Sequence, residues 1–123
     1  MNNTIMVVDD DESNLYLLES LLDDEGYDVI EAHNYPEMAI ELQKARPALI
    51  LLDYMMPGEN GIEICQILKR DAELESIPIV MVSAVDDSET IAEAMEAGAI
   101  DWVCKPVDDE AILQHARAAV GSQ

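Results

Sequence analysis

Apolar and amphipathic segments alternate five times along this chain. The nearly continuous apolar segments predict five strands. These are Thr4–Val8, Asp28–Ala32, Ala48–Asp53, Ile77–Val82 and Ile100–Cys104. An amphipathic segment with apolar residues at helical spacing follows each strand. Repeated strand and helix units of this kind are typical of α/β domains with a parallel sheet.

Capping and turn residues mark the ends of the predicted helices. Each helix has a start signal, and the five signals are Ser13, Pro36, Gly61, Asp87 and Asp109. The first, second and fourth helices end at Gly26, Pro47 and Gly98. The side chains expected to face the core are Leu15, Leu18, Leu21, Leu22, Met38, Ala39, Leu42, Ile64, Ile67, Leu68, Ile91, Ala94, Met95, Ile112, Leu113 and Ala116.

The order of these elements restricts the topology of the sheet. Right-handed crossovers with helices on both faces give a doubly wound, flavodoxin-like (βα)5 sheet with strand order 2-1-3-4-5. The first, third and fourth strands are nearly all apolar, so we expect them at the centre of the sheet. The length of 123 residues fits a single domain that covers residues 1–123.

No segment of the chain predicts a membrane location. The apolar runs are far shorter than the roughly 20 residues that span a bilayer. The first residues, MNNTIMVVDDD, lack the basic start of a secretory signal. We therefore expect a soluble, cytoplasmic protein.

The chain is strongly acidic. Six basic residues stand against 27 acidic ones, which gives a formal net charge of −21. Such a surface repels nucleic acids and anionic lipids, so we expect no direct binding to either. Two explanations of the charge remain open: a solvated surface suited to a saline cytosol, and a surface that attracts a basic protein partner.

The cysteines and histidines do not suggest a metal site. Cys65 and Cys104 lack a CxxC spacing and lie in apolar segments, which predicts buried, reduced thiols. His33 and His115 have no second ligand at metal spacing. We interpret both histidines as ordinary surface or loop residues.

Polar residues stand at the C-terminal ends of four predicted strands. Asp9 and Asp10 follow the first strand, and Asp53 ends the third. Ser83 and Lys105 follow the fourth and fifth strands. Open parallel sheets bind their ligands beyond the carboxyl ends of the strands, so we expect these side chains to share one cleft.

Three converging carboxylates require compensation of their charge. Either some of them are protonated or a divalent cation neutralises them. Oxygen ligands without histidine or cysteine favour Mg²⁺, with Mn²⁺ as the alternative. In the purely structural interpretation, Asp9 and Asp10 would only cap the helix that follows them.

Asp53 begins the segment DYMMPGENG, in which Pro57 and Gly58 predict a tight loop. This loop leaves the carboxylate at the strand end, where it can attack phosphorus and form an acyl phosphate. Lys105 would contact one oxygen of the phosphoryl group, and Ser83 would hydrogen-bond another. The structural alternatives are a turn-forming aspartate, a surface lysine and a strand-end hydroxyl satisfied by the backbone.

Four segments, VVDDDESN, LLDYMMPGENG, VSA and WVCKP, resemble a known family in their order and spacing. They are similar to the receiver domain of bacterial two-component response regulators, and the similarity covers essentially the whole chain. The resemblance implies that Asp53 is the phosphoacceptor. It also implies that Asp9, Asp10 and Asp53 bind Mg²⁺ together with the main-chain carbonyl of Met55.

The resemblance further implies how a signal would arise. Ser83 would follow the phosphoryl group together with Lys105, and an aromatic residue would turn inward as a switch. Trp102 stands where the family normally has Tyr or Phe, so a switching rotamer and a fixed packing or partner-contact residue are both open alternatives. A cis peptide bond is implied before Pro106.

The implied function is a phosphorylation switch. The chain would accept a phosphoryl group from a histidine kinase or a phosphotransfer protein, with the first helix setting the specificity. It would not be an enzyme in its own right, although it would assist its own phosphorylation and dephosphorylation. The surface of the fourth helix, fifth strand and fifth helix would then shift and contact an output domain or a basic partner, or form a phosphorylation-dependent dimer.

Two other functions remain open from the sequence. A receiver-like interaction module would keep the fold and dock partners without being phosphorylated. A phosphohydrolase would also use Asp53 as nucleophile, but it requires a carboxylate two residues later, where this chain has Met55. The full set of acids together with Ser83 and Lys105 favours the switch.

Overall fold

The structure, a computed structural model, describes residues 2–121 as ten alternating strands and helices. The strands are β1 (Thr4–Val8), β2 (Asp28–Ala32), β3 (Leu49–Leu52), β4 (Ile79–Ser83) and β5 (Asp101–Cys104). The helices are α1 (Glu12–Asp24), α2 (Tyr35–Lys44), α3 (Gly61–Lys69), α4 (Ser88–Ala97) and α5 (Asp109–Gly121). The predicted (βα)5 alternation is confirmed.

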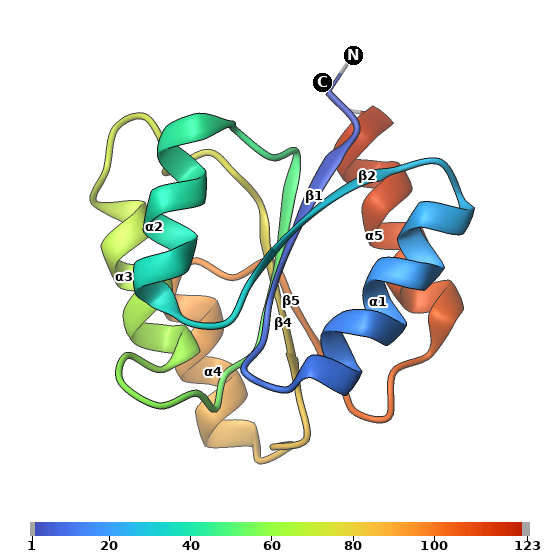
Figure 1. Cartoon of the computed structure of the whole chain (residues 1–123). Coiled ribbons are helices and arrows are strands. Elements are labelled where there is room, and N and C mark those ends of the chain that lie inside the picture. The colour runs from blue at the N-terminus through green and yellow to red at the C-terminus, as the bar shows by residue number, and fades with distance from the viewer. Residues whose placement is uncertain (1, 122–123) are drawn as a thin grey trace.

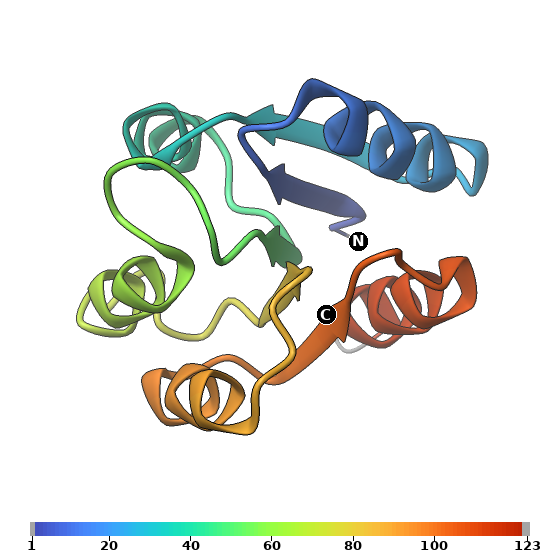
Figure 2. The same ribbon diagram turned by 90° about the horizontal axis from the view of Figure 1, so that it is seen from below.

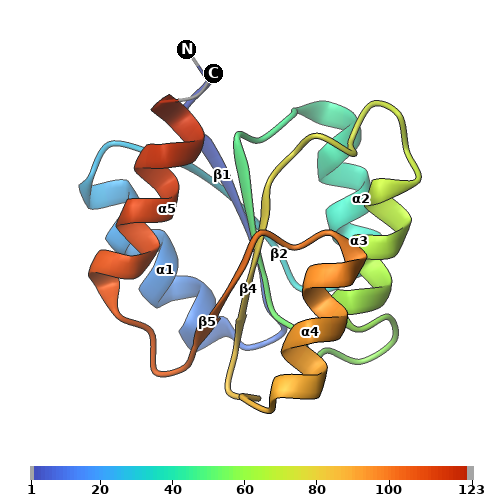
Figure 3. The ribbon, with the colours of Figure 1, turned by 180° about the vertical axis from the view of Figure 1, so that it is seen from behind.

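The elements form three layers. Five parallel strands make the middle layer in the order β2-β1-β3-β4-β5, as predicted. Helices α1 and α5 cover one face of the sheet, and α2, α3 and α4 cover the other (Figure 1, Figure 3). Figure 2 shows the sheet between these two helical layers from below.

Successive strand residues face opposite helical layers. In β1, Ile5 and Val7 pack with the side chains of α1 and α5, whereas Met6 and Val8 pack with those of α2, α3 and α4. All residues of β3 and β4 are buried, because both strands have neighbours on either side and helices on both faces. The predicted central position of the first, third and fourth strands is therefore confirmed.

Three strands differ slightly from their predicted ranges. β4 begins at Ile79 rather than Ile77, because Pro78 has no N–H group to donate to a neighbouring strand. β5 begins at Asp101 rather than Ile100, whose side chain is 52% exposed. β3 is one residue shorter than predicted at each end.

The helices agree with the prediction except at a few positions. The N-cap of α1 is Asp11 and not Ser13: the Asp11 carboxylate accepts hydrogen bonds from the N–H groups of Ser13 and Asn14 at 2.8 and 3.3 Å. α2 ends at Lys44, three residues before the predicted end. Met95 is 41% exposed, because α4 points Ala94 at the sheet and each next residue is turned by about 100°.

The two cysteines differ in their surroundings. Cys65 is buried in α3 as predicted, and burial raises the pKa of its thiol to about 11. Cys104 is exposed, contrary to the prediction of a buried thiol. The reason is its position as the last residue of β5, which is an edge strand with only β4 beside it.

Gly61 allows α3 to begin directly against the end of β3. A Cβ atom on Gly61 would lie 2.9 Å from both the main-chain oxygen of Asp53 and the Cα of Tyr54, which is too close for any side chain. The N–H of Gly61 also donates to the carbonyl of Tyr54 at 2.9 Å. This hydrogen bond joins the start of the loop after β3 to the first residue of α3.

The described helices are short. The longest ones, α1 and α5, have 13 residues each. Within residues 2–121 we find no helix with the length and apolar character needed to cross a membrane.

Candidate phosphoryl-transfer site

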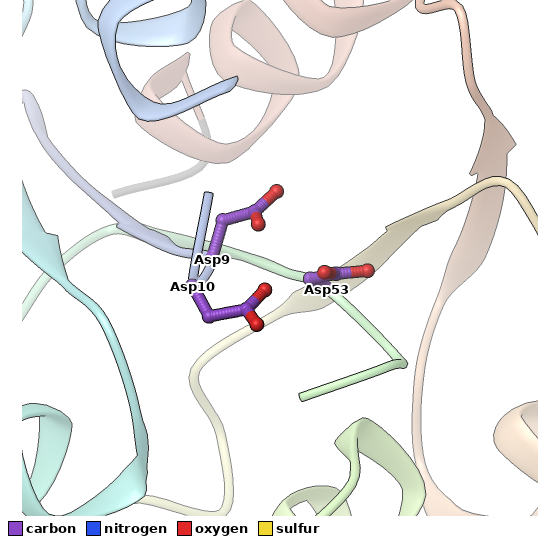
Figure 4. A group of neighbouring side chains, drawn as sticks. All are labelled: Asp9, Asp10 and Asp53. Carbon is purple, nitrogen blue, oxygen red and sulfur yellow. The ribbon is translucent and has the colours of Figure 1, made fainter. Parts of the chain in front are cut away.

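Three carboxylates meet at the carboxyl edge of the sheet. Asp9, Asp10 and Asp53 each place one carboxylate oxygen within 4.8 Å of the others (Figure 4). Asp9 and Asp53 are only 2% and 5% exposed, whereas Asp10 is open to solvent. The predicted convergence of these acids is confirmed, and one of them remains accessible from outside.

Backbone hydrogen bonds fix the two buried acids. The N–H of Asp53 donates to the carbonyl of Val8 at 2.9 Å, and the N–H of Asp9 donates to the carbonyl of Ala32 at 3.1 Å. Both bonds continue the pairing of parallel strands by one residue. The two carboxylates are therefore positioned by the sheet itself, which is more rigid than a loop.

Lys105 supplies a basic group to these acids. Its Nζ lies 2.9 Å from Oδ2 of Asp9 and 3.7 Å from Oδ2 of Asp53. The N–H of Lys105 donates to the carbonyl of Ser83 at 2.9 Å, so the ends of β4 and β5 are joined beside the site. The peptide bond between Lys105 and Pro106 is cis, as predicted.

The surroundings of Asp53 oppose the ionisation of its carboxyl group. Burial and the neighbouring Asp9 carboxylate raise the pKa of Asp53 to about 6, although an aspartate ordinarily titrates at about 4. Lys105 and the N–H of Met55, which lies 3.4 Å from Oδ1 of Asp53, act in the opposite direction without offsetting burial. Lys105 therefore compensates the negative charge of the acids only in part, and a further positive charge would stabilise the ionised form of Asp53.

Ser83 ends β4 and Trp102 lies within β5, and both side chains bond to Val85 rather than to the acids. The buried Ser83 Oγ accepts a hydrogen bond from the N–H of Val85 at 3.3 Å. Trp102 is 9% exposed, and its indole N–H donates to the carbonyl of Val85 at 2.9 Å. Its ring lies 5.7 Å from that of Tyr54, centroid to centroid. Trp102 is thus an inward-facing residue in this structure.

Met55 lies next to the acids, although its predicted role is not decided by these contacts. Its N–H points at Asp53, and its side chain is 62% exposed. The use of its main-chain carbonyl as a metal ligand stays a prediction.

A second charged cluster at this edge was not predicted. His33 Nδ1 lies 2.7 Å from Oε1 of Glu37, and His33 Nε2 contacts Oε1 of Glu12. These two hydrogen bonds raise the pKa of His33. The spacing of four residues between His33 and Glu37 could have suggested the first pair, but nothing in the sequence pointed to Glu12. His115 likewise bonds to a carboxylate, at 2.8 Å from Oδ2 of Asp101.

The sequence also matches a known protein family. The family profile described as the response regulator receiver domain matches residues 5–117. The chain belongs to this family. As a receiver domain, it is of the type found in the response regulators of two-component systems.

Individual relatives agree with this assignment. The receiver domain is 38% identical over 118 residues to response regulator PleD of Caulobacter vibrioides and 36% identical over 118 residues to DNA-binding response regulator MtrA of Mycolicibacterium smegmatis. Both matches cover 96% of this chain but only 26% of PleD and 50% of MtrA. The chain therefore spans between a quarter and a half of the length of these relatives.

A solved structure matches over almost its whole length. Chemotaxis protein CheY4 of Vibrio cholerae has a TM-score of 0.89 to this receiver domain at 28% sequence identity. The match covers 97% of this chain and 99% of that one. The doubly wound fold is thus shared with a solved response regulator.

Proposed function

We propose that this receiver domain is a phosphorylation switch in which Asp53 accepts a phosphoryl group from a phosphohistidine donor. The observation that carries the proposal is the convergence of Asp9, Asp10 and Asp53 with Lys105 at one edge of a buried sheet. An inert docking module has no need for two buried carboxylates in contact, because burying charge is costly unless it serves a purpose. A phosphohydrolase remains disfavoured by Met55, which is not an acid.

The three carboxylates also suit a divalent cation. Their donor atoms are all oxygens, and one lysine cannot neutralise three acids. Mg²⁺ prefers oxygen ligands and keeps part of its water shell, which the exposed Asp10 allows. We therefore assign Asp9, Asp10, Asp53 and the main-chain carbonyl of Met55 to Mg²⁺, with Mn²⁺ as the substitute. The ion would supply positive charge against the phosphoryl oxygens.

Phosphoryl transfer to Asp53 forms one bond and breaks one. A carboxylate oxygen of Asp53 attacks the phosphorus while the phosphorus–nitrogen bond of the donor breaks, and the electron pair of that bond stays on the imidazole nitrogen. Lys105, 3.7 Å from the Asp53 carboxylate, would contact a phosphoryl oxygen. The Ser83 hydroxyl accepts from Val85 and keeps its own proton for another phosphoryl oxygen. On this account the domain assists its own phosphorylation and is not an enzyme for other substrates.

A groove next to α1 supports docking of the donor protein. It extends to Lys105, and its remaining lining residues are Asn14, Leu17, Leu18, Leu21, Asp24, Val82, Pro106, Val107 and Asp109. Leu17 and the neighbouring Tyr16 are 62% and 67% exposed. We infer that a histidine kinase or phosphotransfer protein covers these apolar side chains and so brings its phosphohistidine to Asp53.

The output surface is proposed to be formed by α4, β5 and α5. Met95 and Ile100 are 41% and 52% exposed on α4 and just before β5, where a partner could cover them. An output domain, a basic protein and a second phosphorylated copy are the three candidate partners. A receiver needs only a population shift to signal, so small displacements of this surface are sufficient.

The experiment that tests this function is intact mass spectrometry. Wild-type protein incubated with Mg²⁺ and acetyl phosphate should gain the mass of one phosphoryl group, and EDTA should prevent the gain. Asp53→Asn should show no gain. The matched control is Asp28→Asn, which makes the same change at an exposed residue at the opposite end of the sheet and should be phosphorylated normally. No gain in the wild type would favour the docking module, and steady release of phosphate from monoesters would favour the hydrolase.

A further inference from the structure

Trp102 connects the two loops that leave β3 and β4. Its ring packs against Tyr54, the first residue after Asp53, with an interplanar angle of 49°. Its indole N–H donates to the carbonyl of Val85, the second residue after Ser83. The side chain is buried, so both contacts lie away from bulk water. One side chain of β5 therefore touches the neighbour of the phosphoacceptor and the loop that follows the site hydroxyl.

Val85 links the side chain of Trp102 to that of Ser83. Its carbonyl is held by Trp102 at 2.9 Å, and its N–H donates to Oγ of Ser83 at 3.3 Å. A hydroxyl that accepts a hydrogen bond from a fixed donor has a restricted orientation for its own proton. The position of Val85 thus restricts the direction in which the Ser83 hydroxyl can donate.

An outward rotation of Trp102 would be costly. It would break the hydrogen bond to Val85, separate the indole from Tyr54 and expose a large apolar ring to water. Phenylalanine at this position would have no donor for the carbonyl of Val85. The indole therefore combines burial with a hydrogen bond that a purely apolar aromatic residue cannot make.

We propose that Trp102 is a positioning residue that acts through Val85, holding the Ser83 hydroxyl ready for a phosphoryl oxygen, and that it stays inward before and after phosphorylation. The proposal rests on the proposed function of Asp53 and Ser83. It differs from a rotating switch, because the aromatic side chain is a fixed support and the loop after β4 is held by it.

The test uses the fact that Trp102 is the only tryptophan of the chain. Growth of a tryptophan auxotroph on benzothienylalanine replaces the indole N–H by sulfur at this one site and keeps the size and shape of the ring. Growth on 5-fluorotryptophan is the matched control, because it alters the ring but retains the N–H donor. Beryllofluoride with Mg²⁺ serves as the phosphoryl analogue, and its affinity is measured by calorimetry.

The expected result is a loss of affinity in the sulfur analogue alone. Removal of one neutral hydrogen bond should weaken beryllofluoride binding by about three- to tenfold, while the fluorinated protein should bind like the wild type. Equal affinities in all three proteins would overturn the positioning role.

A second measurement examines whether Trp102 turns. The single indole N–H signal of ¹⁵N-labelled protein should remain protected from hydrogen exchange with and without beryllofluoride. Rapid exchange of this proton in the bound state would overturn the fixed orientation.

If the wild type does not bind beryllofluoride at all, the proposed function fails. Amide exchange at Val85 in the free protein then decides the positioning role, since it should be faster in the sulfur analogue.

Discussion

Two clusters of this receiver domain contain one basic side chain and two carboxylates each, but they differ in burial. They are the buried cluster of Lys105, Asp9 and Asp53 and the exposed cluster of His33, Glu12 and Glu37. Side-chain exposure is at most 19% in the first and at least 39% in the second. Composition alone would not distinguish them.

The pKa values of the two clusters respond differently to these neighbours. In the exposed cluster, hydrogen bonds to Glu37 and Glu12 raise the pKa of His33, and the same bond to His33 lowers the pKa of Glu37. In the buried cluster, burial raises the pKa of Asp53 to about 6 even though Lys105 is close. Burial therefore decides whether the ionised form of a carboxylate beside a base is favoured, as in Glu37, or opposed, as in Asp53. A carboxylate whose negative charge is not fully compensated suits a binding site.

The largest effect should come from removing the buried base. Without Mg²⁺ at pH 7, Lys105→Met should lower the free energy of unfolding by about 3 kcal/mol, because two buried acids lose their partner. Urea denaturation measures the change. Lys44→Met removes the lysine of an exposed pair with Glu41 and should cost less than about 0.5 kcal/mol. Similar losses in the two variants would contradict the importance of burial.

A smaller effect should appear when the acid itself is neutralised. The folded pKa of Asp53 is about 6, above the unfolded value of about 4, so folding favours the protonated form. Its stabilising contribution is complete below about pH 4 and is lost as the pH rises through about 6. Without Mg²⁺, Asp53→Asn should therefore be more stable than the wild type at pH 7 by about 2 kcal/mol, and equally stable near pH 4.

Denaturation curves between pH 4 and pH 8 measure this difference. Asp28→Asn is the control, and its curve should run parallel to that of the wild type because Asp28 is exposed. Parallel curves for Asp53→Asn as well would show that the buried carboxylate does not titrate in the expected range.

The smallest effect should come from the exposed cluster. The folded pKa of His33 is raised, so its contribution to stability is complete below about pH 6.5 and is lost as the pH rises through the folded value. His33→Gln should cost less than about 1 kcal/mol at pH 6, because the cluster is solvated. Ring-proton NMR should give a His33 midpoint above that of a free histidine, and Glu12→Gln and Glu37→Gln should each lower it. An unchanged midpoint in both variants would contradict the hydrogen bonds.

The sequence allowed the main part of the site to be predicted because strand order determines it. Asp9 and Asp53 follow apolar strands that pair in parallel, and the bond from the Asp53 N–H to Val8 is a direct continuation of that pairing. The difference between buried Asp9 and exposed Asp10 could not be predicted. Adjacent residues of an extended chain point in opposite directions, and sequence alone does not say which of the two faces the cluster.

Features that depend on distant segments were also missed or left open. The orientation of Trp102 depends on a carbonyl 17 residues earlier, and the contact of His33 depends on Glu12, 21 residues earlier. Met95 and Cys104 were assigned to the core from their apolar surroundings. Cys104 ends the edge strand β5, and Met95 lies on a side of α4 that no further layer covers.

Gly61 determines how closely α3 approaches the main chain of Asp53, the proposed phosphoacceptor. Only a hydrogen atom fits between it and the main chain of Asp53, and the loop between them is closed by a hydrogen bond to Tyr54. The main chain at Asp53 is therefore held between β3 and α3, and a phosphoryl donor, on the proposed function, would meet a carboxylate that is already in a fixed position. Any larger residue in place of Gly61 would push α3 away from the end of β3 and change the direction of the Asp53 carboxylate.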